Sequence, residues 1–425
     1  MRTSCYAPAL VRAPVLALGL LMWTAGAHAE LALTWQQCAA EAAAHNPDLR
    51  AAQAQLQASG FQRQSATSGF FPQVTANAGY TYSGGDKPYA SGSAYSAGLG
   101  LNQNVFAGYL DQSKITQATA NEAAVAATLA LAKAKLSYDL KFAFQGLVYT
   151  QGYQKLTQDI LHRRADNLRL VELRFDSGRE NKGSALLSRA YLAQAQLDAL
   201  QARNARAVAQ AQLARVLGRD ANQDILIKDN LPLNEPEMQP DLVALVLQTP
   251  DYQQAIAQEQ AAQAGVGIAR ATVYPNVNLT SQLNRQGEAV SLPDTRWSLG
   301  VSMNYPLYNG GKDTHTIQSA GALATAAQDA RTATHMQLRV RLKQAHVGLM
   351  EAVQRLKTDQ AFYEAATVRA QIAREKYNNG LLTFDEWDII ENDLVNREKN
   401  RLQSQRERVI AEAAWDQALG RGVIP

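Results

Sequence analysis

An internal duplication is the feature that most constrains this 425-residue chain. Pro47-Asp-Leu49 is followed by a second proline at position 72, and Pro250-Asp-Tyr252 is followed by one at position 275, so that both intervals are 25 residues (72−47 and 275−250). Farther along, Leu217-Gly-Arg219 matches Leu419-Gly-Arg421 at an offset of 202 (419−217), and this offset holds without a gap over long stretches. Such self-similarity predicts two copies of one structural unit.

Long helices are predicted in each copy. Residues 107–218 contain no proline and are rich in Ala, Leu, Gln, Lys and Arg, which are good helix formers. Apolar residues recur at steps of four, three and four, as in a coiled-coil seam. In the first copy these are Leu136, Leu140, Ala143 and Leu147, and in the second they are Leu338, Leu342, Ala345 and Leu349. The first arm, of roughly 65 residues, is then on the order of 100 Å long.

A β-hairpin is predicted within each copy, at about 73–106 and about 276–308. Residues in these segments alternate, with Val, Ala, Tyr, Trp, Leu and Met on one face and small polar residues on the other, which is the period-two pattern of a strand. Strands of roughly ten residues with one apolar face and aromatic residues near the ends are typical of the strands of a transmembrane β-barrel. A half-solvated hairpin of a soluble sheet is the alternative.

The remaining boundaries follow from composition. Residues 1–29 have the charged, apolar and small-residue regions of a secretory signal peptide. Residues 30–219 form the first repeat, 220–240 a proline-containing linker, and 241–425 the second repeat. Cys38 has no internal partner in the predicted mature chain, so no disulfide framework is expected. The formal net charge of +3 argues against a nucleic-acid binder.

These elements predict a rod of helices capped by a four-stranded sheet. Four strands cannot close a barrel, because the smallest barrel has about eight. Open strand edges would leave unpaired backbone groups in lipid, which is unfavourable. Several chains are therefore expected to share one barrel, and the physical argument allows two or three.

The sequence resembles the TolC family of outer-membrane efflux proteins over essentially the whole predicted mature chain. The segments that carry the resemblance are 33–37 (Leu-Thr-Trp-Gln-Gln), 46–52 (Asn-Pro-Asp-Leu-Arg-Ala-Ala), 71–74 (Phe-Pro-Gln-Val), the strand exits at 102–108 and 304–311, and the helical turn at 377–394. The resemblance implies a mainly α-helical fold with a membrane β-barrel portion. Three chains would form a twelve-stranded barrel, continued by an α-helical tunnel of long antiparallel coiled-coil helices.

The same resemblance implies location in the outer membrane and partners for the channel. The protein would extend into the periplasm and conduct, passively, what an inner-membrane pump of the RND, ABC or MFS type delivers through a periplasmic adaptor. The turns near Gly178 and Gly380 would be the periplasmic tips that contact the adaptor and close the tunnel. The residues expected there are Ser177, Gly178, Arg179, Asn379, Gly380 and Leu381.

Acidic residues follow the second tip. In the family an acidic residue six positions after the tip glycine commonly lines the constriction, and Glu386 occupies that position, with Asp385 and Asp388 beside it. Three copies would form a negatively charged ring that favours cations. The alternative is a solvated helix start, where the helix dipole stabilises negative charge.

The predicted gate departs from the family pattern. A family member's gate is locked by a tyrosine, an arginine and an acid; Tyr377 is present here, but Leu382 and Ser184 occupy the other two positions. We therefore expect a looser or differently fastened gate. Installing the missing charges by Leu382→Arg with Ser184→Asp is expected to lower conductance in a planar bilayer, and an unchanged conductance would contradict this hypothesis.

Aromatic residues cluster where the predicted strands meet the helices. We interpret them as an interfacial belt at the surface of the outer-membrane lipid. Ordinary packing at the junction of barrel and tunnel is the alternative for each. These residues are Phe70, Phe71, Tyr274, Tyr305 and Tyr308.

Other functions fit the sequence less well. The histidines of the predicted helices lack metal-ligand spacing, no nucleophile elbow or phosphate loop is present, and so no enzyme, cofactor or metal site is predicted. A structural periplasmic coiled coil without a pore is the main competitor, but it has no need of two hairpins of membrane-spanning length. Drug, metal-ion and protein cargo all remain open, and the acidic tip leans slightly toward cations.

Overall fold

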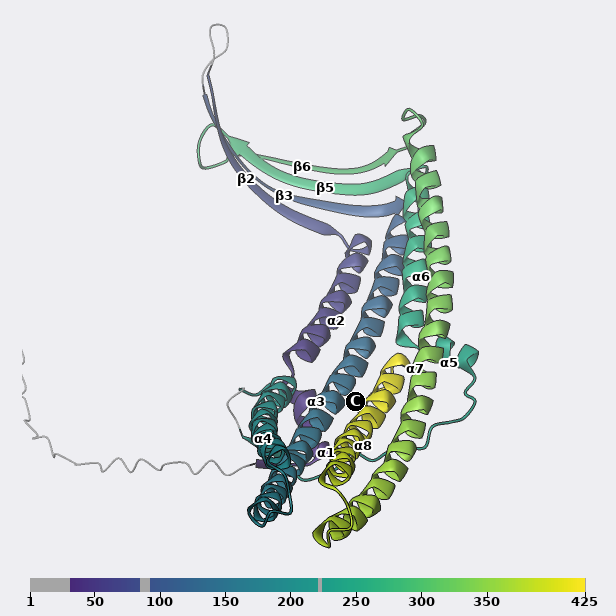
Figure 1. Ribbon diagram of the computed structural model, residues 1–425. Helices are drawn as coiled ribbons and strands as arrows, with labels where there is room; N and C mark the ends of the chain where they lie inside the picture. Colours follow the sequence, from purple (N-terminus) through teal and green to yellow (C-terminus); the bar gives the residue numbers. More distant parts are fainter. Residues whose placement is uncertain (1–30, 85–91, 221–223, 425) are drawn as a thin grey trace, which may run out of the picture.

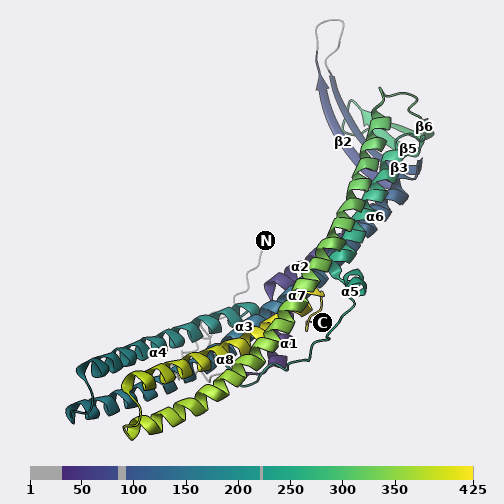
Figure 2. The same ribbon diagram turned by 45° about the vertical axis from the view of Figure 1, so that its right-hand side comes forward.

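The computed structural model describes residues 31–84, 92–220 and 224–424 (Figure 1). The predicted signal peptide, residues 1–29, lies outside these residues. The molecule is an elongated rod, with a β-sheet at one end and two helical hairpins at the other (Figure 2). No helix within the described residues is both long enough and apolar enough to cross a membrane.

Each repeat has the same order of elements. In the first, the helices are α1 (Trp35–His45), α2 (Pro47–Ala66), a short 3-10 helix η1 (Thr67–Phe70), α3 (Leu110–Asp176) and α4 (Lys182–Leu217), with strands β2 (Gln73–Ser83) and β3 (Gly92–Ala107) before α3. In the second, the helices are α5 (Leu242–Gln248), α6 (Pro250–Ala271), α7 (Lys312–Asn378) and α8 (Phe384–Ala418), with strands β5 (Asn276–Gly287) and β6 (Asp294–Asn304). The long arms α3 and α7 each contain 67 residues.

The predicted coiled-coil seam forms the core of the rod. Leu140 and Leu147 of α3 are completely buried, and so is Leu342 of α7. Around α3 pack α2, α4, α6 and α8, while α7 packs against α6 and α8. Both the helix that precedes the hairpin and the helix that returns from the tip therefore lie along the same long arm, as their summed lengths predict.

The hairpins join into one antiparallel sheet, in the order β2-β3-β5-β6. Leu99 of β3 lies opposite Leu283 of β5, which in turn lies opposite Trp297 of β6. On the other face of the sheet, Thr75 of β2 lies opposite Gly100 of β3, which lies opposite Gln282 of β5. The apolar and polar faces read from the sequence thus run across all four strands, and Trp297 is 78% exposed. The second hairpin is shorter than predicted, because β6 ends at Asn304 rather than near residue 308.

Two elements near the middle of the rod have no clear sequence pattern. Strand β1 (Leu31–Leu33) pairs in parallel with β4 (Ile225–Ile227) of the linker.

Farther along the linker, Asn234 donates from its side chain to Glu412 of α8, 3.0 Å away, and Glu412 also accepts from Arg408 at 2.8 Å. These contacts bind the linker to the helices.

Candidate functional site

The two helical tips contain the same turn. After α3, Gly178 has a φ of 72° and the Arg179 N–H donates to the Arg174 carbonyl, 2.8 Å away. After α7, Gly380 has a φ of 73° and the Leu381 N–H donates to the Lys376 carbonyl, also at 2.8 Å. A left-handed residue with this six-to-one hydrogen bond is a Schellman motif, and glycine adopts it without the steric cost of a Cβ.

The six residues predicted to contact an adaptor all lie at these turns and are exposed: Ser177, Gly178, Arg179, Asn379, Gly380 and Leu381. Leu381 is 74% exposed. The two turns lie side by side at the end of the rod (Figure 2). Their accessibility is what a docking site needs, although contact with an adaptor stays a prediction.

Tyr377 links the two tips of one chain. Its side chain is completely buried, and its hydroxyl donates to Glu180 Oε2, 3.0 Å away. The Arg174 guanidinium lies 4.4 Å from the centre of the Tyr377 ring and donates to the Tyr377 carbonyl. On the other side the ring stacks on Trp387, with centroids 4.4 Å apart. The ring of Phe384 also meets it edge-on, with centroids 6.4 Å apart. Tyr377 is thus held by one acid, one arginine and two aromatic rings.

Within one chain, an acid other than the one at the family position reaches Tyr377. The position predicted for the acidic partner holds Ser184, but Glu180 comes within reach of the same tyrosine from the α3–α4 turn. Burial, followed by the nearby Glu180 carboxylate, raises the pKa of Tyr377. The phenol therefore stays protonated and acts as the donor. No sequence pattern marked Glu180 or Arg174 as partners of Tyr377.

Asp388 faces its own chain. Its carboxylate accepts from the Tyr191 hydroxyl at 3.0 Å and from Asn392 Nδ2 at 2.9 Å, and Arg164 lies 3.8 Å away. Arg164 in turn lies over the Tyr191 ring, 4.6 Å from its centre. Burial raises the pKa of Asp388 despite these donors. Its hydrogen bond from Tyr191 holds α8 against α4, and its ion pair with Arg164 holds α8 against α3.

Glu386 and Asp385 are exposed at the start of α8. Glu386 forms a capping box with Thr383: the Thr383 N–H and hydroxyl donate to Glu386 Oε2, at 3.1 and 2.8 Å, and the Glu386 N–H donates back to the threonine oxygen. These hydrogen bonds lower the pKa of Glu386, so the carboxylate is charged at neutral pH. The helix-start interpretation accounts for its presence, and an exposed charge is also what a constriction ring requires.

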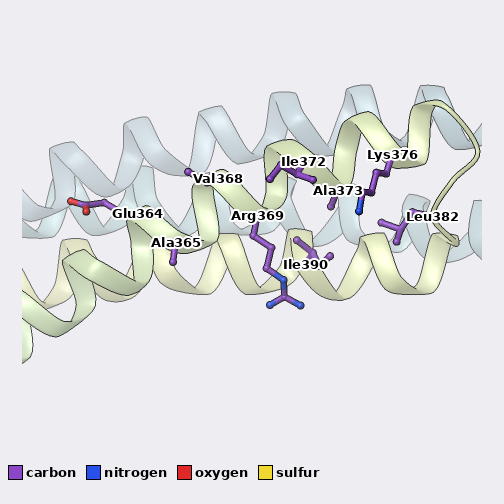
Figure 3. Close-up of a pocket in the computed structure, with 9 residues that line it drawn as sticks. All are labelled: Glu364, Ala365, Val368, Arg369, Ile372, Ala373, Lys376, Leu382 and Ile390. Atoms are coloured by element: carbon purple, nitrogen blue, oxygen red, sulfur yellow. The ribbon is translucent and has the colours of Figure 1, made fainter.

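An apolar groove runs along α7 and α8 beside the second tip (Figure 3). Its volume is about 670 Å³. Val368 and Ile372 of α7 are 59% and 52% exposed there, and Leu382 and Ile390 lie on the α8 side. Lys376 and Arg369 add positive charge to the same surface, and Glu364 adds a negative charge. Exposed branched side chains of this number usually mark a contact surface.

The predicted belt aromatics lie at the other end of the rod and are all exposed, from 45% for Tyr274 to 86% for Tyr308; the others are Phe70, Phe71 and Tyr305. Tyr274 meets the edge of Tyr109, with ring centres 6.2 Å apart. Tyr109, at 68% exposed and with a φ of 65°, was missed, although it directly follows the predicted strand exit.

The described residues contain no group of three His, Cys, Asp or Glu side chains that could hold a metal ion. Cys38 is completely buried in the core around α1, and burial raises the pKa of its thiol to about 11.

Comparison with known proteins agrees with this geometry. The family model described as "Outer membrane efflux protein" matches residues 39–219 and again 243–421, once in each repeat. The chain is 26% identical to the probable outer membrane lipoprotein SilC of Salmonella typhimurium over 414 residues, covering 90% of this chain and 85% of SilC.

Two further similarities extend the comparison. The solvent efflux pump outer membrane protein SrpC of Pseudomonas putida is 26% identical over 255 residues, about half of each chain. A solved structure of CusC, described in terms of transmembrane channel formation, superposes with a TM-score of 0.83 at 19% identity, covering 91% of this chain and 92% of CusC. The fold is thus that of a known outer-membrane channel.

Proposed function

Because the chain belongs to the outer membrane efflux protein family, whose members are efflux channels of the outer membrane, we propose that three copies build one continuous exit duct. Each copy would supply four strands to a shared barrel of twelve and four long helical segments to a tunnel in the periplasm. The duct would receive cargo from an inner-membrane pump through a periplasmic adaptor and conduct it passively to the outside.

The observation that carries the shared barrel is the pair of open sheet edges. In the described part of the chain the sheet has four strands, and β2 and β6 form its edges. One face of these strands is apolar and exposed, with Trp297, Val301 and Met303 each at least 70% exposed. Backbone groups at such an edge need partners in lipid. Edge β6 of one copy pairing with edge β2 of the next satisfies them, and three copies give a twelve-stranded ring.

The proposed docking of the adaptor rests on the tips. Both Schellman turns project from the end of the rod farthest from the sheet (Figure 2). Leu381 and Arg179 are exposed at corresponding positions, since 381−179 is 202. An adaptor that contacts one tip can therefore contact the other in a similar way. This duplication supports a partner that binds around the ring at regular intervals.

We assign the constriction ring to Glu386 and Asp385, which are exposed beside the second tip. The lowered pKa of Glu386 keeps that carboxylate charged at neutral pH. Asp388 contributes less, because Tyr191, Asn392 and Arg164 already surround it. Three copies of the two exposed acids would select for cations and bind divalent ions.

We attribute the choice of cargo to the pump. Among proteins similar to this chain, SrpC is named for solvent efflux and CusC for a cation efflux system. One duct fold therefore occurs in proteins named for chemically different cargo. The exposed aromatic residues at the barrel–tunnel junction would anchor the duct at the lipid surface in every case.

Single-particle imaging of the detergent-extracted protein tests the proposal. We expect a hollow rod with threefold end views and a length above roughly 100 Å, since each 67-residue arm alone spans about that distance. A solid fibre or a compact particle without a lumen would contradict the channel. Twofold end views would retain the shared barrel and overturn the trimer.

A further inference from the structure

We propose that the apolar groove on α7 and α8 is the seat for Phe175 of a neighbouring copy. The groove is lined by Val368, Ile372, Lys376, Leu382 and Ile390 (Figure 3). Phe175 is the third residue before Gly178, near the end of α3, and 39% of its side chain is exposed in the single chain. The inference rests on the proposed closed ring and adds which side chains join the copies at the gate.

The internal repeat supplies the template for this contact. Within one chain, Tyr377 of the second repeat docks against Arg174 and Glu180 of the first. In a closed ring the repeats alternate, so the second repeat of one copy meets the first repeat of the next. The contacts of the interface between copies follow if the offset of 202 is added to residues of the first repeat and subtracted from residues of the second. Arg174 becomes Lys376 and Glu180 becomes Leu382, while Tyr377 becomes Phe175, since 377−202 is 175.

At the positions related by the offset of 202, the side chains proposed to meet are chemically complementary to each other. Tyr377 carries a hydroxyl, and a carboxylate oxygen of Glu180 accepts a hydrogen bond from it at 3.0 Å. Phe175 lacks that hydroxyl, and the corresponding partner is Leu382, an apolar side chain that lines the groove. The change from phenol to phenyl on one side is thus matched by a change from acid to leucine on the other. An unmatched exchange would bury a carboxylate without a donor.

Both interfaces have a cationic side chain at the position beside the aromatic ring. Arg174 lies 4.4 Å from the centre of the Tyr377 ring. Lys376, at the corresponding position, lines the groove and is exposed in the single chain. A lysine ammonium over a phenylalanine ring gives the same kind of cation–π contact. The groove therefore offers an apolar floor and a cation, which is what a phenylalanine ring needs.

This inference explains how the gate closes between copies without the family's charged lock. Leu382, which replaces the arginine of that lock, lies in the groove. The junction within a chain is then polar, through Glu180 and Tyr377, and the junction between chains is apolar. Both junctions hold the tips in one closed ring.

Cross-linking between chains tests the contact directly. Two full-length versions with different tags are co-expressed, one carrying Phe175→Cys and the other Leu382→Cys, so that only a link between chains joins both tags. We expect an oxidised product containing both tags. Native Cys38 can stay, because its side chain is completely buried. Leu173→Cys replaces Phe175→Cys in the control, since Leu173 is 62% exposed and two residues away, on another face of the helix.

The outcomes separate this inference from the proposed function. A trimer on imaging without the mixed-tag product, or with equal product from Leu173→Cys, would overturn the seat and leave the duct intact. Absence of any hollow ring of copies would overturn both. A second test changes the side chains on the two sides of the contact. Leu382→Glu alone would place a carboxylate against Phe175, so it should raise single-channel open probability at least about fivefold. Adding Phe175→Tyr should return it toward the wild-type value, and failure of this rescue would contradict the pairing.

Discussion

At the scale of single residues, several contacts between the two tips involve one buried side chain, that of Tyr377. Tyr377 combines a hydrogen bond to Glu180, a cation–π contact with Arg174 and stacking on Trp387. Its raised pKa keeps the hydroxyl available as a donor. One residue of the second repeat thereby holds the first tip in place.

Removing the hydroxyl should loosen the gate. Tyr377→Phe leaves the ring contacts but deletes the hydrogen bond to Glu180, which is worth roughly 1.5–3 kcal/mol because the acceptor is charged. We expect the open probability in planar bilayers to rise about fivefold or more, with an unchanged melting temperature for the rod. Tyr363→Phe is the control, because that ring contacts Arg401 instead. Equal conductance for Tyr377→Phe and the wild type would show that the hydrogen bond has no part in closure.

Cys38 should be unreactive in the folded protein. Its side chain has no exposed surface, and its thiol pKa of about 11 leaves little thiolate at pH 8. We expect no alkylation by iodoacetamide at pH 8 without denaturant, and complete alkylation in guanidinium chloride, both measured by mass spectrometry. Rapid labelling of the native trimer would mean that the core around α1 opens.

At the scale of elements, the two tips show one backbone motif stabilised by different side chains. The α4 start is capped by Asn181, which accepts from the Ser184 N–H at 3.0 Å. The α8 start has the full capping box of Thr383 and Glu386. The second tip thus has one more reciprocal contact than the first, next to the proposed constriction.

Loss of the second cap should fray α8. Thr383→Ala removes an N-cap hydroxyl, which costs about 1 kcal/mol. We expect faster amide hydrogen exchange in the first turn of α8, without a change in α4, and wild-type rates for Thr383→Ser. The matched variant Asn181→Ala should speed exchange in α4 alone. Faster exchange in both helices from one substitution would indicate that the two tips unfold as a single unit.

At the scale of the whole molecule, the repeat also predicts how neighbouring sheets align. Within the chain, Leu101 of β3 lies opposite Ser281 of β5. The hairpin offsets are 202 for β3 to β6 and 203 for β2 to β5, so Met303 (101+202) should lie opposite Ala78 (281−203) of the next copy. This register keeps the apolar face continuous around the ring.

Disulfide formation checks that register. Met303→Cys and Ala78→Cys, placed in separately tagged chains, should cross-link efficiently upon oxidation, because directly opposite Cβ atoms lie within about 5.5 Å. Ala76→Cys with Met303→Cys is the control, since Ala76 is on the same face but one diagonal away. Preferential linkage of the control pair would show a register shifted by two residues.

Much of this architecture is readable in the sequence, because hydrophobic period and glycine position are local properties. The seam through Leu140 and Leu147, the alternating strands and the turns at Gly178 and Gly380 each follow from a pattern within a few residues. The duplication then arranges them as two similar units. The fold class and the exposed belt and tip residues could therefore be predicted without coordinates.

Tertiary structure decided which distant side chains meet. Glu180 replaces the expected acid at position 184 because the α3–α4 turn brings it to Tyr377, 197 positions away in the chain. Asp388 faces Tyr191 rather than solvent for the same reason. The pairing of β1 with β4 likewise joins two three-residue strands that are too short to show a period. Spacing along the sequence determines which elements form, whereas contacts between them depend on how long helices pack, and that packing is not encoded in any one stretch.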